Sequence, residues 1–171
     1  MVFLPILIIL TGMFVSFLGH RRLLGNQLTN LQLSYLLALF PFSALLWLVW
    51  HLPFLSSGQV ISWQINWLTL TDLKISLYYD TLSAIFALLV TGIGVLVVVY
   101  SGYYFKDFHG IWRFHSYLLL FMFSMLGLIL SGNLITLFIF WEITSIASFL
   151  LISFNSHSEE ARQGGFKALL I

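Results

Sequence analysis

Apolar residues dominate this chain in five long runs, which alternate with short stretches of polar and charged residues. A helix needs about 20 mostly apolar residues to cross the hydrocarbon core of a bilayer, and each run approaches that length. The predicted membrane-spanning helices cover residues 2–19, 31–50, 81–101, 114–131 and 134–153. A sixth apolar helix is predicted to begin near Arg162 and is cut in mid-element at Ile171, as expected for a truncated or split polypeptide. The pattern therefore predicts an all-α membrane protein with five transmembrane helices and the start of a sixth.

Only one connection between the predicted helices is long, and it runs from His51 to Tyr79. Apolar and polar residues alternate through part of residues 60–78, which is typical of strands. Two short strands joined near Thr71 and Asp72 fit this pattern. They would form a small external β-hairpin on the membrane surface between the second and third helices. An irregular interfacial loop fits the same residues.

Basic residues indicate how the helices are oriented. Six of the seven Lys and Arg residues lie in or beside the first, third and fifth connections. The positive-inside rule places these connections in the cytoplasm and the N-terminus outside. The first apolar run begins at residue 2, and the basic residues Arg21 and Arg22 follow it. In a cleaved secretory signal the basic residues precede the apolar segment, so the order here is reversed. We therefore expect a retained first helix in a multi-pass protein of the cell membrane.

Composition narrows the class of protein. Charged residues make up 8% of the chain, whereas soluble domains carry about 25%, so lipid is the expected solvent for most of the surface. The chain has no cysteine, which excludes disulfides and thiolate metal sites within it, and its five histidines are scattered. A net charge of +1 gives no basic patch for nucleic acid. We expect no metal site and no cofactor.

Glu142 is the acidic residue predicted near the middle of a spanning helix. It lies about eight residues into the last complete apolar run, roughly 12 Å along the helix axis. A charged carboxylate at that depth costs several kcal/mol unless it is paired, hydrated or protonated. Because such a group can take up and release a proton as its surroundings change, we interpret Glu142 as a proton carrier. The alternative is a carboxylate fixed permanently to a cation or to backbone donors.

Four further polar residues are candidates to assist Glu142. Ser145 shares its helix face, where the hydroxyl either holds water or serves helix packing. Lys167 is predicted about 8 Å into the sixth helix, as a cation coupled to Glu142 or as a side chain that extends to the interface. His115 opens the fourth helix near the cytoplasmic face, where a histidine is a proton relay or a structural residue. Asp80 precedes the third helix and is expected to cap its N-terminus.

Several segments resemble a known family. Residues 118–128, Asn133 with Leu134, and residues 140–145 resemble the antiporter-like subunits shared by Mrp-type multisubunit cation/proton antiporters and respiratory complex I. Residues 80–83, 89–94 with 100–101, and 160–170 resemble the large A-type subunit of Mrp Na⁺/H⁺ antiporters. The resemblance is dense from residue 79 onward. It divides the chain into residues 1–79, with two helices and the external loop, and residues 80–171, the start of the proton-translocation module.

The resemblance implies roles for matching residues. Glu142 matches a glutamate essential for coupled ion movement, Lys167 a lysine that modulates it, and Asp80 an acid of the N-terminal segment. His115 and Ser116 depart from the pattern, which has an aromatic and a small residue there. The family's seventh-helix lysine and later proton path would lie beyond Ile171, so a longer subunit or an associated one is expected.

Three functions fit these residues. One is part of a secondary antiporter subunit that exchanges Na⁺ for H⁺ under proton-motive force, with the bilayer and other complex subunits as partners. Another is a proton-pumping subunit of a complex I or membrane-bound hydrogenase type assembly. The third is a non-transporting scaffold fragment. The chain is expected to be a transporter subunit and not an enzyme, unless it belongs to a redox-driven pump.

Overall fold

The computed structural model describes residues 2–18, 29–56, 58–68, 73–106, 110–154, 164–165 and 167. Its elements are α1 (Leu4–Leu18), α2 (Asn30–Trp50), α3 (Leu52–Ser56), β1 (Ile61–Leu68), β2 (Leu73–Tyr79), α4 (Thr81–Tyr104), α5 (Ile111–Ile129) and α6 (Leu134–Ile152). Within these ranges, α2, α4, α5 and α6 are long and apolar enough to cross a membrane, and α1 is a shorter apolar helix of 15 residues. The predicted, mostly helical membrane fold is confirmed. The sixth helix predicted from Arg162 lies largely outside the described residues.

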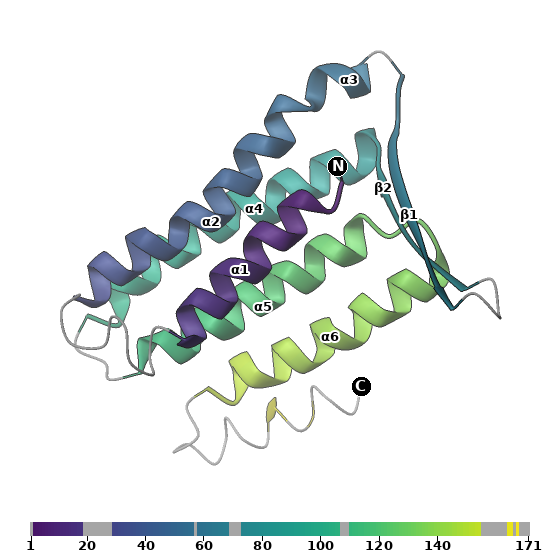
Figure 1. Cartoon of the computed structure of the whole chain (residues 1–171). Helices are drawn as coiled ribbons and strands as arrows, with labels where there is room; N and C mark the ends of the chain where they lie inside the picture. Colours follow the sequence, from purple (N-terminus) through teal and green to yellow (C-terminus); the bar gives the residue numbers. More distant parts are fainter. Residues whose placement is uncertain are drawn as a thin grey trace.

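Helix α1 and the four helices of spanning length run side by side in alternating directions (Figure 1). Helix α1 packs on α2 and α5, α2 packs on α4, and α4 also contacts α5. Large side chains that exclude solvent fill the space between these four helices, among them Ile9, Leu37, Val98, Leu119 and Leu126. Helix α6 lies at the edge of the bundle and packs against α5 and β2. It therefore keeps one broad face that no described helix covers.

The two strands predicted within residues 60–78 are present and pair antiparallel, with Ile61 opposite Tyr79 and Ile65 opposite Ile75. The residues predicted to join them, Thr71 and Asp72, lie outside the described residues. Figure 1 shows the sheet lying across one end of the helices. We therefore call this end of the helix bundle the hairpin end and the other the opposite end.

Backbone hydrogen bonds fix β2 to the short connection between α5 and α6. The Tyr78 amide donates to the Leu130 carbonyl at 2.6 Å, and the Gly132 amide donates to the Ser76 carbonyl at 2.9 Å. The Asn133 side-chain amide also donates to the Lys74 carbonyl, at 2.7 Å. These bonds satisfy backbone groups at an edge of the sheet that would otherwise need water.

Small residues set the closest approaches between helices. A Cβ added at Gly127 of α5 would collide with the ring of Phe140 on α6, and one added at Gly94 of α4 would collide with Met122. The sequence 91–94 resembles a close-packing patch, and the structure confirms this for Gly94. Gly92 has nothing within 4 Å of the position a Cβ would take. Close helix packing through small residues is usual in membrane proteins, where the hydrophobic effect does not drive helices together.

We expect Gly127→Ala to destabilise the protein, because the methyl group must push the Phe140 ring away from α5. Overpacking of this kind costs about 1–3 kcal/mol. Thermal unfolding of the full-length subunit in detergent measures the change. Gly92→Ala is the matched control, since it adds the same methyl group where there is space and should leave the melting temperature unchanged or raised. Equal melting temperatures for the two variants would show that α6 does not pack on α5 as described.

Candidate proton-handling site

Glu142 lies near the middle of α6, a helix of 19 residues. The helix begins where the Asn133 side chain accepts a hydrogen bond from the Thr136 amide at 2.8 Å. Thr136 and Ala147 are the fully buried residues of the helix and mark its inner face. Glu142 is exposed, as is Trp141 beside it, so the carboxylate projects from the face that the described helices leave open. A carboxylate at this depth requires a cation, water or a proton to accompany it.

The hydroxyls beside Glu142 bond to their own helix. Thr144 donates to the Phe140 carbonyl at 2.8 Å, and Ser145 donates to the Trp141 carbonyl at 3.3 Å. Among the described residues, Glu142 makes no hydrogen bond or ion pair. Each hydroxyl oxygen keeps lone pairs after it has donated its hydrogen. Ser145 can therefore still accept a hydrogen bond from water or from a protonated carboxyl group.

Lys167 is exposed, and no ion pair joins it to Glu142. Its position is indicated by Gly165, whose Cβ position lies 3.3 Å from the ring of Phe149 on α6. Phe149 is two turns beyond Glu142, about 10 Å along the helix axis. Gly165, two residues before Lys167, therefore lies against the end of α6 that follows Glu142.

His115 lies one turn into α5, toward the end of the bundle opposite the hairpin, and its side chain is fully buried. Its Nε2 atom is 2.9 Å from the Ser101 hydroxyl of α4 and 3.1 Å from the Ser34 hydroxyl of α2. The physical reason is that α5 turns this side chain toward α2 and α4, where two serines supply polar partners. The structure does not bring His115 together with Glu142, which faces outward on α6.

Other polar contacts surround His115 at the end of the bundle opposite the hairpin. The Ser16 hydroxyl of α1 donates to the Trp112 carbonyl of α5 at 2.9 Å. The Asn30 side-chain amide of α2 donates to the Phe105 and Lys106 carbonyls after α4, at 2.7 and 3.0 Å. These contacts were not predicted from the sequence, because a lone serine in an apolar run is also typical of simple packing. The sequence did contain one indication of these contacts. Ser16, Asn30 and Trp112 each lie within a turn or two of a predicted helix end, and these ends are predicted on the same side of the membrane.

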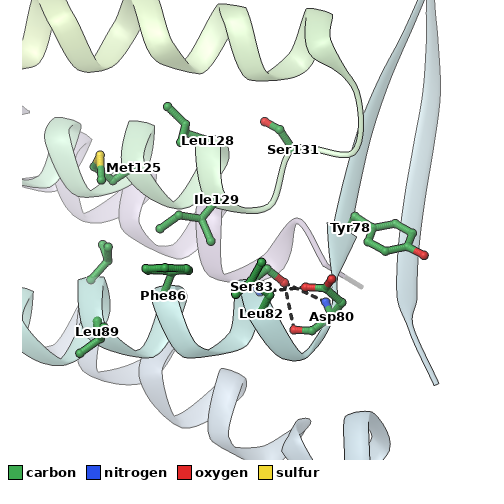
Figure 2. Close-up of a pocket in the computed structure, with 11 residues that line it drawn as sticks. Tyr78, Asp80, Leu82, Ser83, Phe86, Leu89, Met125, Leu128, Ile129 and Ser131 are labelled. Carbon is green, nitrogen blue, oxygen red and sulfur yellow. Dashed lines mark hydrogen bonds between the residues drawn. The ribbon is translucent and has the colours of Figure 1, made fainter. Parts of the chain in front are cut away.

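Asp80 caps α4, as predicted. Its carboxylate accepts a hydrogen bond from the Ser83 amide, and the Ser83 hydroxyl accepts one from the Asp80 amide, both at 2.8 Å (Figure 2). The bond from the Ser83 amide lowers the pKa of the Asp80 carboxyl group below its ordinary value. The neighbouring Tyr79 hydroxyl donates to the Leu48 carbonyl at 3.0 Å, and burial raises the pKa of Tyr79 to about 12. Asp80 therefore stays ionised and Tyr79 stays neutral near pH 7.

A pocket of about 500 Å³ opens between α4 and α5 beside this cap. Figure 2 shows Phe86 and Leu89 on one side and Met125, Leu128 and Ile129 on the other, with Asp80 and Ser83 at the hairpin end. The walls are mostly apolar, and the polar groups of the lining belong to Tyr78, Asp80, Ser83 and Ser131. Within the described part of the chain, no group of three or more His, Cys, Asp or Glu residues is placed to hold a metal ion.

Two family models match the chain. One, described as the N-terminus of chain 5 of NADH-ubiquinone oxidoreductase (complex I), matches residues 67–115. The other, described as the transmembrane region of NADH:quinone oxidoreductase and Mrp antiporters, matches residues 131–171. These matches include Asp80, Glu142 and Lys167 and confirm the resemblance to antiporter-like subunits.

Curated relatives agree with the family models. The chain is 39% identical over 143 residues to the A-type subunit of the Na⁺/H⁺ antiporter of Alkalihalophilus pseudofirmus, a match that covers 83% of this chain and 18% of that protein. It is 45% identical over 119 residues to a probable K⁺/H⁺ antiporter subunit of the A/B type from Rhizobium meliloti, covering 70% of this chain and 12% of that protein. The chain thus spans less than a fifth of the length of these relatives.

Solved structures share the fold. The structure of the Mrp complex from Dietzia sp. matches with a TM-score of 0.82 at 24% identity, over 99% of this chain and 17% of the chain compared. The membrane-bound sulfane sulfur reductase, an archaeal respiratory membrane complex, matches with a TM-score of 0.69 at 21% identity, over 98% of this chain and 24% of that one. The fold of this chain is therefore one that occurs within larger membrane complexes.

We expect Asp80→Ala to destabilise the protein by about 1 kcal/mol, because the Ser83 amide loses its cap. Asp80→Asn should retain most of the stability, since an amide oxygen still accepts that bond. The pKa of Asp80 is lowered in the fold, so its contribution is present above the ordinary aspartate pKa of about 3.9 and is lost as the pH falls through the folded value. Melting temperatures measured from about pH 7 to pH 3 should fall more steeply for the wild type than for Asp80→Asn. Parallel curves would contradict an ionised cap.

Proposed function

We propose that this chain, which carries two segments of the antiporter-like membrane subunits, is part of a secondary antiporter subunit that exchanges Na⁺ for H⁺ across the cell membrane. The supporting observation is the position of Glu142, in the middle of a spanning helix and on the face that the other described helices do not cover. The similarity to the large subunit of a Na⁺/H⁺ antiporter supports the choice of ions. The chain acts as part of a transporter and not as an enzyme.

Glu142 is the proton carrier in this proposal. A carboxylate facing lipid is costly, so the open face of α6 must be covered by further helices that bring water or a cation to it. When a cation approaches, the ionised form is favoured and the proton leaves; when the cation departs, the carboxyl group takes up a proton again. Ser145 holds water beside the carboxyl group, and Lys167 modulates its proton affinity.

The exposed basic residues also support an orientation in the membrane. Lys106 and Arg113 lie at the end opposite the hairpin, and both are exposed. The positive-inside rule assigns this end to the cytoplasm and the hairpin to the outside. Helix α1 then crosses as a fifth span from an external N-terminus, and its 15 residues cover about 22 Å of the hydrocarbon core.

A proton-pumping subunit of a redox-driven complex is the second candidate. It is supported by the family model described for complex I over residues 67–115 and by the fold shared with a respiratory membrane complex. The same glutamate would carry the proton, and a redox reaction in other subunits would supply the energy. Copurification of iron–sulfur or quinone-reactive subunits with the full-length protein would favour this function over secondary antiport.

We expect Glu142→Gln in the full-length subunit to reduce ion exchange by about 100-fold or more, because the amide cannot carry a proton. The measurement is Na⁺-induced proton movement in vesicles that contain the complete complex. Glu159→Gln makes the same chemical change outside the predicted spans and should leave exchange intact. Unchanged exchange in Glu142→Gln at normal complex assembly would exclude Glu142 as the carrier and would favour the scaffold function.

Removing the charge at position 167 should move the pH dependence of exchange. Loss of a nearby cation favours the protonated form of Glu142, so Lys167→Ala is expected to shift the profile to higher pH by about one unit. Lys167→Arg retains the charge and should keep the wild-type profile. If both variants shift alike, or if neither shifts, Lys167 acts by packing or at the membrane interface and not through its charge.

A further inference from the structure

The junction at His115 is separate from the Glu142 face and joins three helices. His115 belongs to α5, Ser101 to α4 and Ser34 to α2, and both hydroxyls lie within 3.1 Å of the same ring nitrogen. All three side chains are buried. The helices approach closely here, because a Cβ added at Gly102, next to Ser101, would collide with the Ser34 hydroxyl. A polar group at such a tight junction must find its partners within it.

The hydroxyl bonds are the basis on which we assign the ring proton to Nε2. Ser34 donates its only hydroxyl hydrogen to the Asn30 carbonyl at 2.9 Å, and Ser101 donates its own to the Val98 carbonyl at 2.7 Å. Both oxygens therefore present lone pairs to Nε2. A neutral imidazole has one N–H, so the donor toward both serines is Nε2–H, and Nδ1 holds a lone pair.

Nδ1 is buried and has no hydrogen-bond partner among the described residues. A proton on this atom would create a buried cation, for which the Val98 and Ile111 carbonyls are the nearby acceptors, and the loss of water on burial outweighs them. The charged or titratable side chains on the packed helices do not compensate. Tyr35 and Tyr103 are exposed and bond to each other at 2.6 Å, Arg113 is exposed, and Glu142 of α6 projects from the open face of that helix. Helix α1, which also packs on α5, has no charged residue in its described range.

We propose that His115 is a positioning residue that holds α2 and α4 against α5 as the neutral Nε2–H tautomer, and that a proton added at Nδ1 opens this junction. The buried cation lacks water, and water reaches it when the helices separate. Since the opened state binds a proton near the ordinary histidine pKa of about 6.5, the junction is closed at neutral and alkaline pH and opens as the pH falls below that value. The proposal concerns helix packing and does not depend on ion exchange.

Spin labels on Phe105→Cys and Phe114→Cys can measure the opening in the full-length subunit. The two rings lie 5.0 Å apart, one just after α4 and the other on α5 beside His115. Labels at this spacing broaden each other's electron paramagnetic resonance spectra, and separation of the helices removes the broadening. We expect the broadening to be retained at about pH 8 and lost on titration toward about pH 4.

His115→Gln is the decisive control, because its amide can donate to both serines but does not titrate. It should keep the broadening across the whole pH range, whereas Ser101→Ala, which removes one acceptor of Nε2–H, should move the loss to higher pH. Solid-state ¹⁵N spectra of labelled histidine should show the Nε2–H tautomer at neutral pH in a signal that His115→Gln removes. Acid opening in His115→Gln, no opening in the wild type, or an Nδ1–H tautomer would each overturn the proposal.

Discussion

Hydrogen bonding within each helix is the constraint on which this structure depends. Inside a bilayer no water satisfies polar groups, so a spanning segment must pair its own backbone and, where it can, its own side chains. The spanning helices follow this rule. Hydroxyls donate to carbonyl groups three or four residues earlier in the same helix, as at Ser43, Thr91, Ser124 and Thr144. These residues add polarity to the helices without requiring a partner elsewhere.

His115 and Glu142 do not follow this rule, and they differ in where their partners lie. His115 receives its partners from two other described helices, so its site is complete within the bundle. Glu142 has no partner among the described residues and projects from the open face of α6. One residue therefore holds helices together, and the other requires water, a cation or a further helix. In the proposed roles, His115 holds the helices in one protonation state, whereas Glu142 acts by changing its protonation state.

The spanning helices could be predicted from the sequence because the length of an apolar run is enough to identify each of them. The predicted ranges 31–50 and 134–153 differ from α2 and α6 by one residue at each end or less. Helix α5 begins three residues earlier than predicted, since Trp112 and Arg113 continue the helix toward the interface. The strands were also predicted, whereas their attachment to residues 130–133 was not, because pairing between distant segments leaves no periodic signal. The cap at Asp80 was predictable from local sequence, but the partners of His115 depend on how three helices rotate against each other.

The burial of α6 indicates where the rest of the site must come from. Its inner face is set by contacts with α5 and β2, and Thr136 and Ala147 are its fully buried residues. The opposite face exposes Phe138 and Trp141 together with Glu142. A carboxylate on a helix face that contacts only lipid would destabilise the protein by several kcal/mol at this depth. An apolar face with one acid at its centre is instead typical of a helix that packs against neighbouring helices along its length. The acid is then the single polar group in that helix–helix interface.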